Sequence, residues 1–419
     1  MCKRFQVTLL GATGITGRNA FDYIAENGHS NLKWNIAGRS EEKLNQILER
    51  AEDNWNKPEI TVVDITDREQ VKAMIKDSQV LIHLAGPYAT HGEFIISQCI
   101  AHRTDYVDIG GETFFIREMI LKYHDAAKAR GVRIIPTAGY ESLPFDILTT
   151  LAIKKMREDY GEKCASVKIV TSFLRSGTIR DNRISGGSIG TMRNILDGDS
   201  IDAFNDMSCL LPEECDRKAI RRRNKVRYKS SYDDDVQAYT GPLQPAPFLN
   251  VPVILRTAYL RANLGYSDKF SYSDSMTMEF YSKSEKGQRK AALQSAIVNR
   301  LTSSIMAGPK IFRFLIRRRL DAMGIKPGDG PSEESLPFID YELRLFAISE
   351  SGERLSGKAI AKGHPGYLST AKIAAEAGLA LSLDTIQDDQ QFGVVTPSVG
   401  LGISFTERLK KAGVSFSFD

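Results

Sequence analysis

An apolar run followed by three regularly spaced glycines constrains the fold of this chain more than any other feature. Val7–Leu10 predicts a buried strand, and Gly11, Gly14 and Gly17 separate it from the helix-compatible stretch Asn19–Ala25. Glycines at this spacing let the chain turn off a strand, bring backbone close to a pyrophosphate and pack the next helix against the sheet. The first N–H groups of that helix attract phosphate. The predicted binding residues are Gly11, Thr13, Gly14, Ile15, Thr16 and Gly17. The alternative is a glycine-rich turn that binds nothing.

Strand and helix patterns alternate up to about Ile153, which is typical of a parallel sheet covered by helices. Beyond it the strands become longer and alternate in polarity, so we expect a second, mostly antiparallel sheet. These longer strands are Cys164–Leu174, Ser271–Phe280 and Leu343–Ser349. The chain is therefore predicted to be α/β, with an N-terminal doubly wound parallel sheet and a second α+β domain.

Glycine-rich segments mark several connections in the second half of the chain. Ser185–Gly190 and Lys326–Pro331 predict loops, which either act as lids and N–H donors over a product or simply join strands. Tyr367–Leu383 and Phe405–Ala412 predict helices on either side of the glycine-rich segment Gly393–Phe405.

Composition excludes several classes of protein. With 42% hydrophobic and 26% charged residues over 419 positions, the chain is typical of a soluble globular protein with more than one domain. A net charge of +4 is too small to indicate nucleic-acid binding. The sequence has no apolar run near the roughly 18 residues that a membrane span needs, and no His-Glu-x-x-His or cysteine pair for a metal. Five cysteines without a Cys-x-x-Cys pair, and a first strand beginning near Phe5 that leaves no room for a targeting peptide, predict a cytoplasmic protein.

Two basic clusters stand out against this modest net charge. Arg217–Lys229 contains eight Lys and Arg residues, and Arg313 and Arg317–Arg319 flank the apolar Phe312, Phe314, Leu315 and Ile316. Most such runs are solvated faces. The sharper interpretation is a surface that meets an anionic lipid headgroup or an acidic carrier protein.

The end of the second predicted strand favours NADP over NAD. A site for NAD usually places Asp or Glu there, whereas this chain has Arg39 and Ser40. A guanidinium pairs with a 2′-phosphate that a carboxylate would repel. The alternative is a surface ion pair between Arg39 and a nearby helix carboxylate. Asp64, at the end of the third predicted strand, is either an adenine-side residue or a capping aspartate.

The fourth predicted strand leads into Ala85, Gly86, Pro87 and Tyr88, where the nicotinamide ribose is expected. Tyr88 and His91 are the nearest proton donors along the chain, although a packed aromatic ring and a surface imidazole explain them equally well. No tyrosine has a lysine four residues later, which excludes the Tyr-x-x-x-Lys pair of the short-chain reductases.

Taken together, these motifs resemble the saccharopine dehydrogenase-like oxidoreductases, including the trans-acting enoyl reductases of mycobacterial lipid assembly. The resemblance covers almost the whole chain. Its segments are Gly11–Gly17, Ala37–Ser40, Gly86–Tyr88, Tyr106–Glu112, Ala138–Asp146, Ser185–Ser188, Gly363–Tyr367 and Thr396–Pro397. Two positions depart from the common pattern. Glu141 stands where relatives have Asp, and His364 stands where Gly-Asp is frequent, in a loop expected on the substrate side.

The resemblance implies NADP(H) as the hydride carrier and three structural parts. A Rossmann domain is expected at residues 1–155, an α+β domain for substrate and dimerisation at 156–355, and a segment packing back on the Rossmann domain at 356–419. A homodimer follows from the same resemblance.

The leading functional hypothesis is an NADPH-dependent reductase acting on an activated C=C of an acyl or lipid-type substrate, free or carrier-bound. Tyr88 is the first candidate for the proton donor, with His91, Glu141 and Asp108 behind it. One alternative is reduction of an imine, as in saccharopine formation. The other is a non-catalytic nucleotide-binding module that docks on a lipid surface.

Overall fold

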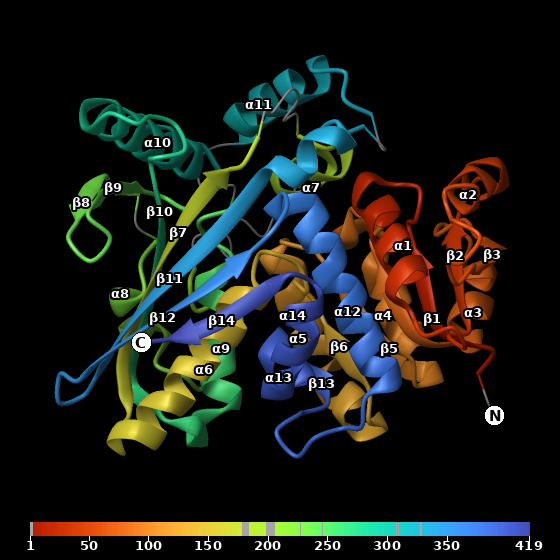
Figure 1. The fold of residues 1–419 in the computed structure, drawn as a ribbon, viewed down its shortest axis with the longest axis horizontal. Helices are drawn as coiled ribbons and strands as arrows, with labels where there is room; N and C mark the ends of the chain where they lie inside the picture. Colours follow the sequence, from red (N-terminus) through yellow and green to blue (C-terminus); the bar gives the residue numbers. More distant parts are fainter. Residues whose placement is uncertain are drawn as a thin grey trace.

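Two seven-stranded sheets lie side by side in the computed structural model (Figure 1). The structure describes residues 3–177, 184–197, 206–226, 228–244, 246–306, 308, 310–326 and 329–419. No helix of the described residues is long and apolar enough to cross a membrane.

The first sheet is wholly parallel, with strand order β13-β6-β5-β4-β1-β2-β3. Its strands β1, β2 and β4 are buried on both faces, which explains their near-continuous apolar sequences. The strands are β1 Phe5–Leu10, β2 Trp34–Gly38, β3 Glu59–Val62, β4 Ser78–His83, β5 Asp105–Asp108, β6 Arg133–Ile135 and β13 Gly393–Val394. The intervening helices are α1 Ile15–Asn27, α2 Glu41–Leu48, α3 Arg68–Asp77, α4 Tyr88–His102 and α5 Thr113–Arg130. The predicted doubly wound sheet is confirmed.

The second sheet has the order β14-β12-β11-β7-β10-β9-β8, and all its described pairs except β7–β10 are antiparallel. β11 alternates strictly between buried and half-buried residues, as expected for a sheet with one covered face. The strands are β7 Cys164–Arg175, β8 Ser231–Asp233, β9 Ala238–Gly241, β10 Tyr266–Thr277, β11 Ile339–Ser349, β12 Arg354–Ala361 and β14 Val414–Phe418. The mostly antiparallel second sheet is confirmed.

The remaining helices connect or cover the two sheets. They are α6 Leu143–Tyr160, α7 Gly186–Asp197, α8 Arg217–Arg223, α9 Asn250–Leu260, α10 Glu285–Met306, α11 Lys310–Ala322, α12 Thr370–Leu383, α13 Pro397–Leu401 and α14 Thr406–Lys411, with short turns η2 Ala262–Leu264, η3 Glu333–Phe338, η4 Pro365–Ser369 and η5 Ile403–Phe405.

The C-terminal segment of the chain contributes strands to both sheets. Strands β12 and β14 extend the second sheet, whereas β13 pairs with β6 and α12 packs on α1, β4 and β5 of the first. The division at residue 356, and the packing of the segment after it on a Rossmann domain, stay predictions.

Helix α12 approaches the first sheet closely because its inner face is made of small residues. Ala371, Ala374 and Ala375 are fully buried. A Cβ placed on Gly378 would lie 2.4 Å from Cδ1 of Ile82 in β4. Close packing of this kind leaves no room for an added methyl group.

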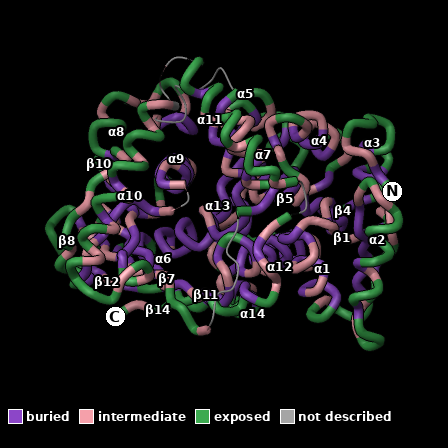
Figure 2. Tube along the Cα trace, turned by 90° about the horizontal axis from the view of Figure 1, so that it is seen from above, coloured by how far each residue is buried: buried purple, intermediate pink, exposed green. Residues whose placement is uncertain are grey.

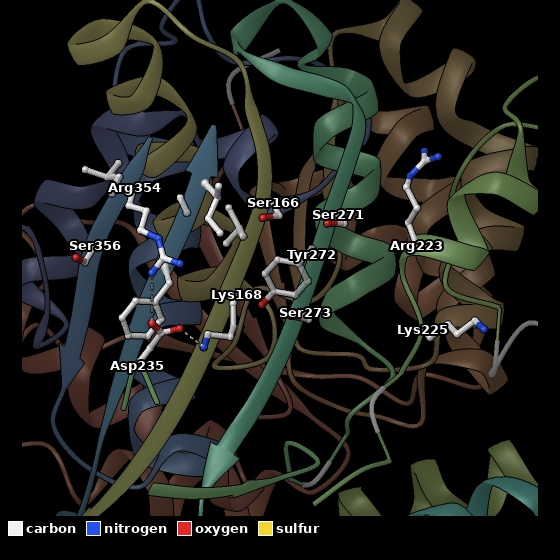
Figure 3. A pocket seen from close by; sticks show the side chains of 15 residues that line it. Ser166, Lys168, Arg223, Lys225, Asp235, Ser271, Tyr272, Ser273, Arg354 and Ser356 are labelled. Atoms are coloured by element: carbon white, nitrogen blue, oxygen red, sulfur yellow. Dashed lines mark hydrogen bonds and ion pairs between the residues drawn. The ribbon is translucent and has the colours of Figure 1, made fainter. Parts of the chain in front are cut away.

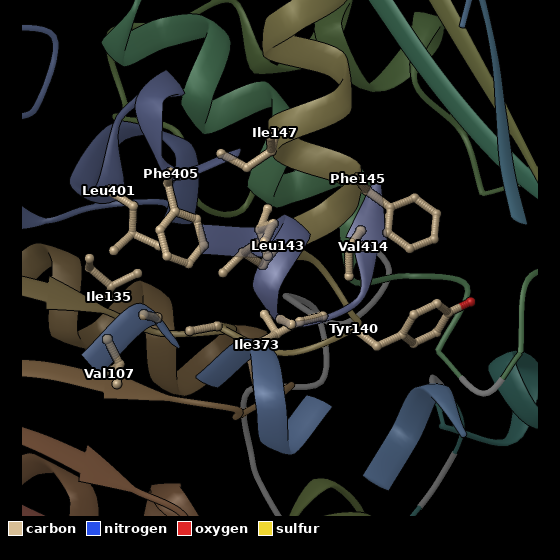
Figure 4. Close-up of a cluster of buried hydrophobic side chains, with 14 of the residues drawn as sticks. Val107, Ile135, Tyr140, Leu143, Phe145, Ile147, Ile373, Leu401, Phe405 and Val414 are labelled. Carbon is tan, nitrogen blue, oxygen red and sulfur yellow. The ribbon is translucent and has the colours of Figure 1, made fainter. Parts of the chain in front are cut away.

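One apolar core joins the two halves of the molecule (Figure 4). Leu143 and Phe145 of α6 meet Ile373 of α12 and Phe405 of η5, while Ile135 contributes from the first sheet. Buried residues are correspondingly concentrated around α6, α12 and β1 (Figure 2).

Some local predictions were wrong. Gly186–Gly190 of the loop expected at Ser185–Gly190 form the start of α7, because the Ser185 hydroxyl accepts a hydrogen bond from Ser188 N (3.2 Å) and caps the helix. In the loop expected at Lys326–Pro331, residues 327 and 328 lie outside the described residues. The strand β14 after the last helix was not anticipated.

We predict that Gly378→Val lowers the free energy of unfolding by about 1–3 kcal/mol, because the larger side chain overpacks the contact with Ile82. Urea unfolding measures the loss. The double variant Gly378→Val/Ile82→Ala should lose less than the sum of the two single changes, since the truncated Ile82 makes room. Strict additivity would contradict the close contact as the cause.

Candidate active site

The sequence-predicted site residues gather at one edge of the first sheet. Because strands β1 to β6 are parallel, the segments that follow them meet at the carboxyl edge. These segments are Gly11–Gly17, Arg39–Ser40, Asp64, Ala85–Tyr88 and Tyr140–Glu141. His91 lies in the first turn of α4 at the same edge.

Two glycines of the first loop are required by the fold itself. Gly11 has φ +91°, and a Cβ there would lie 2.8 Å from the backbone N of Ala85. A Cβ on Gly17 would lie 2.1 Å from the carbonyl oxygen of Gly11. These residues set the turn off β1 and the close packing of α1.

Gly14 is different, because no contact with the described part of the chain requires a glycine there. Its φ is −75°, an ordinary value, and a Cβ would meet only the Gly11 oxygen at 3.5 Å. Helix α1 begins at the next residue, and it has no capping side chain and no acidic residue in its first turn. The open space and the uncapped N–H groups suit a pyrophosphate, whose approach a methyl group would obstruct.

The equivalent position after β4 is already occupied by a protein carboxylate. Glu112, only 1% exposed, accepts a hydrogen bond from Ala89 N (2.6 Å) in the first turn of α4, and one from the Thr191 hydroxyl (3.3 Å). Burial raises the pKa of Glu112, and its hydrogen bonds oppose that rise. Sequence reasoning did not assign Glu112 a role. Its position directly before α5 suggests a cap for that helix, yet its side chain binds the start of α4.

Arg39 and Ser40 follow β2 as predicted. Ser40 caps α2 by accepting a hydrogen bond from Lys43 N (3.3 Å). Arg39 is exposed, and within the described ranges no hydrogen bond or ion pair involves its side chain. The alternative of a surface ion pair for Arg39 is therefore not supported.

Asp64 forms a tight local turn. Its carboxylate accepts hydrogen bonds from Thr66 N (2.9 Å) and the Thr66 hydroxyl (2.8 Å). These bonds lower the pKa of Asp64, with a smaller contribution from the nearby Arg39. The local role is thus visible, and contact with adenine stays a prediction.

The geometry argues against Tyr88 as the proton donor. Its ring is 4% exposed, and its hydroxyl donates to the backbone oxygen of His83 (3.2 Å). Burial raises the pKa of Tyr88 well above its usual value. The side chain packs beneath the Gly86–Pro87 turn instead of pointing to solvent, so the packed-aromatic alternative fits better. His91 is half-buried.

A buried hydrogen-bonded chain runs beneath this turn. The Tyr106 hydroxyl lies 2.7 Å from Asp108 Oδ2 and 3.0 Å from His83 Nδ1, and His83 Nε2 lies 3.1 Å from the Ala85 oxygen. Burial raises the pKa of Asp108 to about 6 and lowers the pKa of His83 to about 4. The chain therefore links a titrating carboxyl to the backbone beside the expected nicotinamide ribose.

The hydrogen bonds between Ala85, His83, Tyr106 and Asp108 determine where each proton lies. The Ala85 oxygen only accepts, so Nε2 of a neutral His83 must carry the proton and Nδ1 must accept from Tyr106. The Tyr106 hydroxyl can then accept a hydrogen bond from Asp108 only while Asp108 is protonated. When Asp108 ionises, Tyr106 donates to it instead, and one bond of the chain is lost. Asp108 acts here through its neighbours, as a positioning residue.

Glu141 has the properties of an accessible proton source. Ala246 N donates to its Oε1 (3.3 Å), and the side chain is half-buried. Burial, with a smaller contribution from the Asp274 carboxyl, raises the pKa of Glu141 to about 8. Asp274 in β10 accepts from Asn250 Nδ2 (2.9 Å), and burial raises its pKa to about 6. Sequence reasoning missed Asp274 because only the packing of β10 brings it near Glu141.

Segments of the second half of the chain close over the glycine loop. A Cβ on Gly330 would lie 2.8 Å from Cδ1 of Ile15, and Gly186 N donates to the Asp329 oxygen (3.0 Å). His364 lies on the turn η4 that packs against α1. Burial lowers the pKa of His364 to about 4, so its imidazole is neutral at physiological pH.

A cavity of about 490 Å³ lies elsewhere, on the second sheet (Figure 3). Its lining includes Lys168 and Arg354, both paired with Asp235. None of the sequence-predicted site residues lines it.

Comparisons with known proteins agree with this geometry. Residues 7–135 match the family model of the saccharopine dehydrogenase NADP binding domain. This N-terminal part is therefore similar to an NADP-binding domain family, and the chain is an NAD(P)-dependent oxidoreductase. Curated trans-acting enoyl reductases of Mycobacterium bovis and Mycobacterium ulcerans are 28% and 27% identical to it, over 98–99% of this chain and 97–98% of theirs.

Two solved structures share the fold of this chain. Saccharopine dehydrogenase (L-Glu forming) of Saccharomyces cerevisiae has a TM-score of 0.53 and 12% identity, covering 99% of both chains. Homospermidine synthase of Legionella pneumophila, in complex with NAD, has a TM-score of 0.53 and 10% identity, covering 99% of this chain and 92% of its own. The NAD(P)-dependent oxidoreductase class predicted from the sequence is confirmed.

We predict that Gly14→Ala weakens NADPH binding at least about tenfold while leaving the apo protein as stable as wild type. The methyl group makes only an ordinary contact with the Gly11 oxygen (3.5 Å) but occupies the space proposed for the pyrophosphate. Fluorescence titration gives the affinity, and thermal unfolding of the apo protein gives the stability.

A matched change separates pyrophosphate from 2′-phosphate binding. Arg39→Asp should weaken NADPH binding but spare NADH, whereas Gly14→Ala should weaken both. Equal affinity of the wild-type protein for the two cofactors would contradict the assignment of Arg39.

We predict that Asp108→Asn removes a pH dependence of stability. The folded-state pKa of Asp108 is raised, so protonation of this carboxyl favours folding at low pH, and that advantage is lost as the pH rises through about 6. Asparagine reproduces the protonated form, since its amide donates to Tyr106. The stability of wild type relative to the variant should therefore fall by up to about 3 kcal/mol between about pH 4 and about pH 7.

Urea unfolding across this pH range tests the prediction. His83 is present in both proteins, so its own titration cancels in the comparison. Parallel profiles for the two proteins would show that Asp108 does not titrate in this range.

Proposed function

We propose that this oxidoreductase uses NADPH to reduce an activated C=C bond in an acyl or lipid-type substrate. The observation that carries the proposal is the near full-length similarity to curated trans-acting enoyl reductases. The open position at Gly14 and the guanidinium of Arg39, which has no hydrogen bond or ion pair with the described residues, support NADPH as the reductant.

We assign different roles in cofactor binding to the residues at the carboxyl edge. The uncapped start of α1 would hold the pyrophosphate of NADPH, and Arg39 would bind its 2′-phosphate. When bound, the cofactor would supply the hydride for the β-carbon of the C=C. Glu112 fills the start of α4, so that this second helix terminus does not compete for phosphate.

Glu141 is our candidate for the catalytic acid, in place of Tyr88. With a pKa of about 8, its carboxyl carries a proton at neutral pH. That proton passes to the α-carbon as the C=C becomes C–C, and the resulting carboxylate regains a proton from water. In the net reaction the substrate gains one hydride and one proton, and NADP⁺ is released.

The charge of the surroundings disfavours a substrate with several carboxylates. Above about pH 6 the carboxyls of Asp108 and Asp274 are ionised in this part of the molecule, so additional substrate carboxylates would be repelled. This disfavours the imine alternative of saccharopine type. A carrier-bound substrate and a homodimer stay predictions.

We predict that the protein oxidises NADPH with α,β-unsaturated acyl thioesters and not with their saturated counterparts. The loss of absorbance at the nicotinamide band measures this oxidation. Glu141→Gln should lower kcat about 100-fold or more while leaving NADPH affinity unchanged. The wild-type rate should fall as the pH rises through about 8, because the acid must be protonated, and this limb should vanish in Glu141→Gln.

Glu141→Asp is the matched control, since it keeps the carboxyl and restores the residue expected in relatives. It should recover part of the activity. Turnover with an amine plus a 2-oxo acid, and not with enoyl thioesters, would overturn the proposal in favour of imine reduction.

A further inference from the structure

We propose that helices α10 and α11 form a docking surface for a membrane with anionic headgroups. The surface consists of exposed apolar residues on both helices together with Arg318 and Arg319. It lies at the upper edge of the molecule in Figure 1. The inference does not depend on the proposed reaction.

Helix α11 already uses its inner face for packing. Ile316 and Leu320 pack against Ile195 and Leu196 of α7. Ion pairs reinforce this contact, with Arg193 Nε 2.7 Å from Asp321 and Arg317 bound to Asp197. The inner face of α11 therefore explains how the helix is held in place.

The outer face of α11 carries large apolar side chains that the fold does not use. Ile311, Phe312, Phe314 and Leu315 are between 51% and 59% exposed. Exposed large apolar side chains are common singly, but four within one and a half turns of a helix mark an interaction site. Two of them are aromatic, and such residues suit the headgroup region of a bilayer.

Helix α10 also carries exposed apolar side chains on the face that does not pack on the second sheet. Its Ala292 and Ala296 are buried on the side that packs on β9. Leu293, Ile297 and Leu301 follow one another at helical spacing and are between 49% and 57% exposed. The two helices contact each other, so their apolar residues belong to one region of the surface.

The charge of this region decides the kind of partner. Residues 283–323 contain ten Lys and Arg and only two Asp and Glu, whereas the whole chain has a net charge of +4. The rest of the chain is therefore net negative overall, although the stretch Arg217–Lys229 carries a second concentration of positive charge. Arg318 and Arg319 are exposed at the end of the apolar face.

Basic and apolar residues on one amphipathic helix fit an anionic lipid surface. The apolar side chains enter the acyl boundary, and the long arginine side chains reach the headgroups. An acidic carrier protein would use the arginines but would leave four neighbouring apolar side chains in water. A second copy of this chain would bring two strongly positive surfaces together. The lipid surface satisfies both features.

Binding to this surface would also bring the candidate site close to lipid. Helix α11 packs on α7, and α7 reaches the Gly86–Pro87 turn, where a Cβ on Gly190 would lie 3.3 Å from Pro87 Cγ. Asn194 of α7 donates to the Thr90 hydroxyl of α4 (3.0 Å). One helix thus separates the docking surface from the proposed cofactor edge.

Vesicle flotation tests the proposal with the full chain. The protein should float with phosphatidylcholine vesicles that contain about 30% phosphatidylserine, and much less with pure phosphatidylcholine. Salt at about 0.5 M should weaken the binding. Phe312→Ser/Phe314→Ser and Arg318→Glu/Arg319→Glu should each reduce binding about tenfold or more.

Matched variants control for hydrophobicity and for charge. Leu121→Ser/Ile386→Ser removes two exposed apolar residues elsewhere, and Arg222→Glu/Arg223→Glu makes the same charge change on α8. Both should bind vesicles like wild type. Arg227, in the basic cluster Arg217–Lys229, lies outside the described residues.

Three results would overturn the proposal. They are no flotation of the wild-type chain, equal losses in the α8 and α11 charge variants, or a dimer in ultracentrifugation that dissociates on Phe312→Ser/Phe314→Ser without vesicle binding. NADPH oxidation with a water-soluble enoyl thioester is measured separately, so a failure of membrane binding is distinguished from a failure of the proposed reaction.

Discussion

The contact between α12 and the first sheet holds the two halves of the molecule in one piece. Small side chains let α12 lie directly on β4, and Gly378 marks the closest approach, to Ile82. On its other side, Glu376 of α12, 2% exposed, accepts from the Tyr23 hydroxyl (2.7 Å) and from Arg408 Nη1 (2.8 Å). Helix α12 thus connects α1, which starts at the glycine loop, to α14, which leads into the second sheet. The position of every segment at the carboxyl edge depends on this connection.

The N-termini of α1 and α4 differ in whether a protein carboxylate already binds them. Both α1 and α4 follow parallel strands, and both present free N–H groups to the same edge. Glu112 supplies a carboxylate to α4, whereas among the described residues no side chain caps the start of α1. A doubly charged phosphate linkage therefore finds one open helix start and one that is already filled. The same comparison explains why Gly14 is a glycine without any internal steric reason.

Local patterns predicted the parallel sheet and the glycine loop because strand, turn and helix signals there are adjacent in the chain. Arg39 was predictable for the same reason, since it directly follows β2. Glu112 was missed because its partner Ala89 lies across the sheet edge, and Asp274 because β10 reaches Glu141 only through tertiary packing. The hydroxyl of Tyr88 could not be oriented from sequence, since its bond to His83 depends on how α4 packs. Strand β13 pairs with β6 over two residues, Gly393 and Val394, too short a run to give a periodic signal.

The late arrival of β13 has a consequence for biosynthesis. Strand β6 forms the edge of a parallel sheet until Gly393 and Val394 pair with it, and α12 covers that sheet only after Leu383 has been made. At typical translation rates the interval between β6 and β13 is roughly 10–50 s. During this time the nascent N-terminal part exposes an unpaired strand edge and an uncovered apolar face. A ribosome-associated chaperone that shields apolar surface would therefore be most useful to this chain in that interval, well before the polypeptide is released.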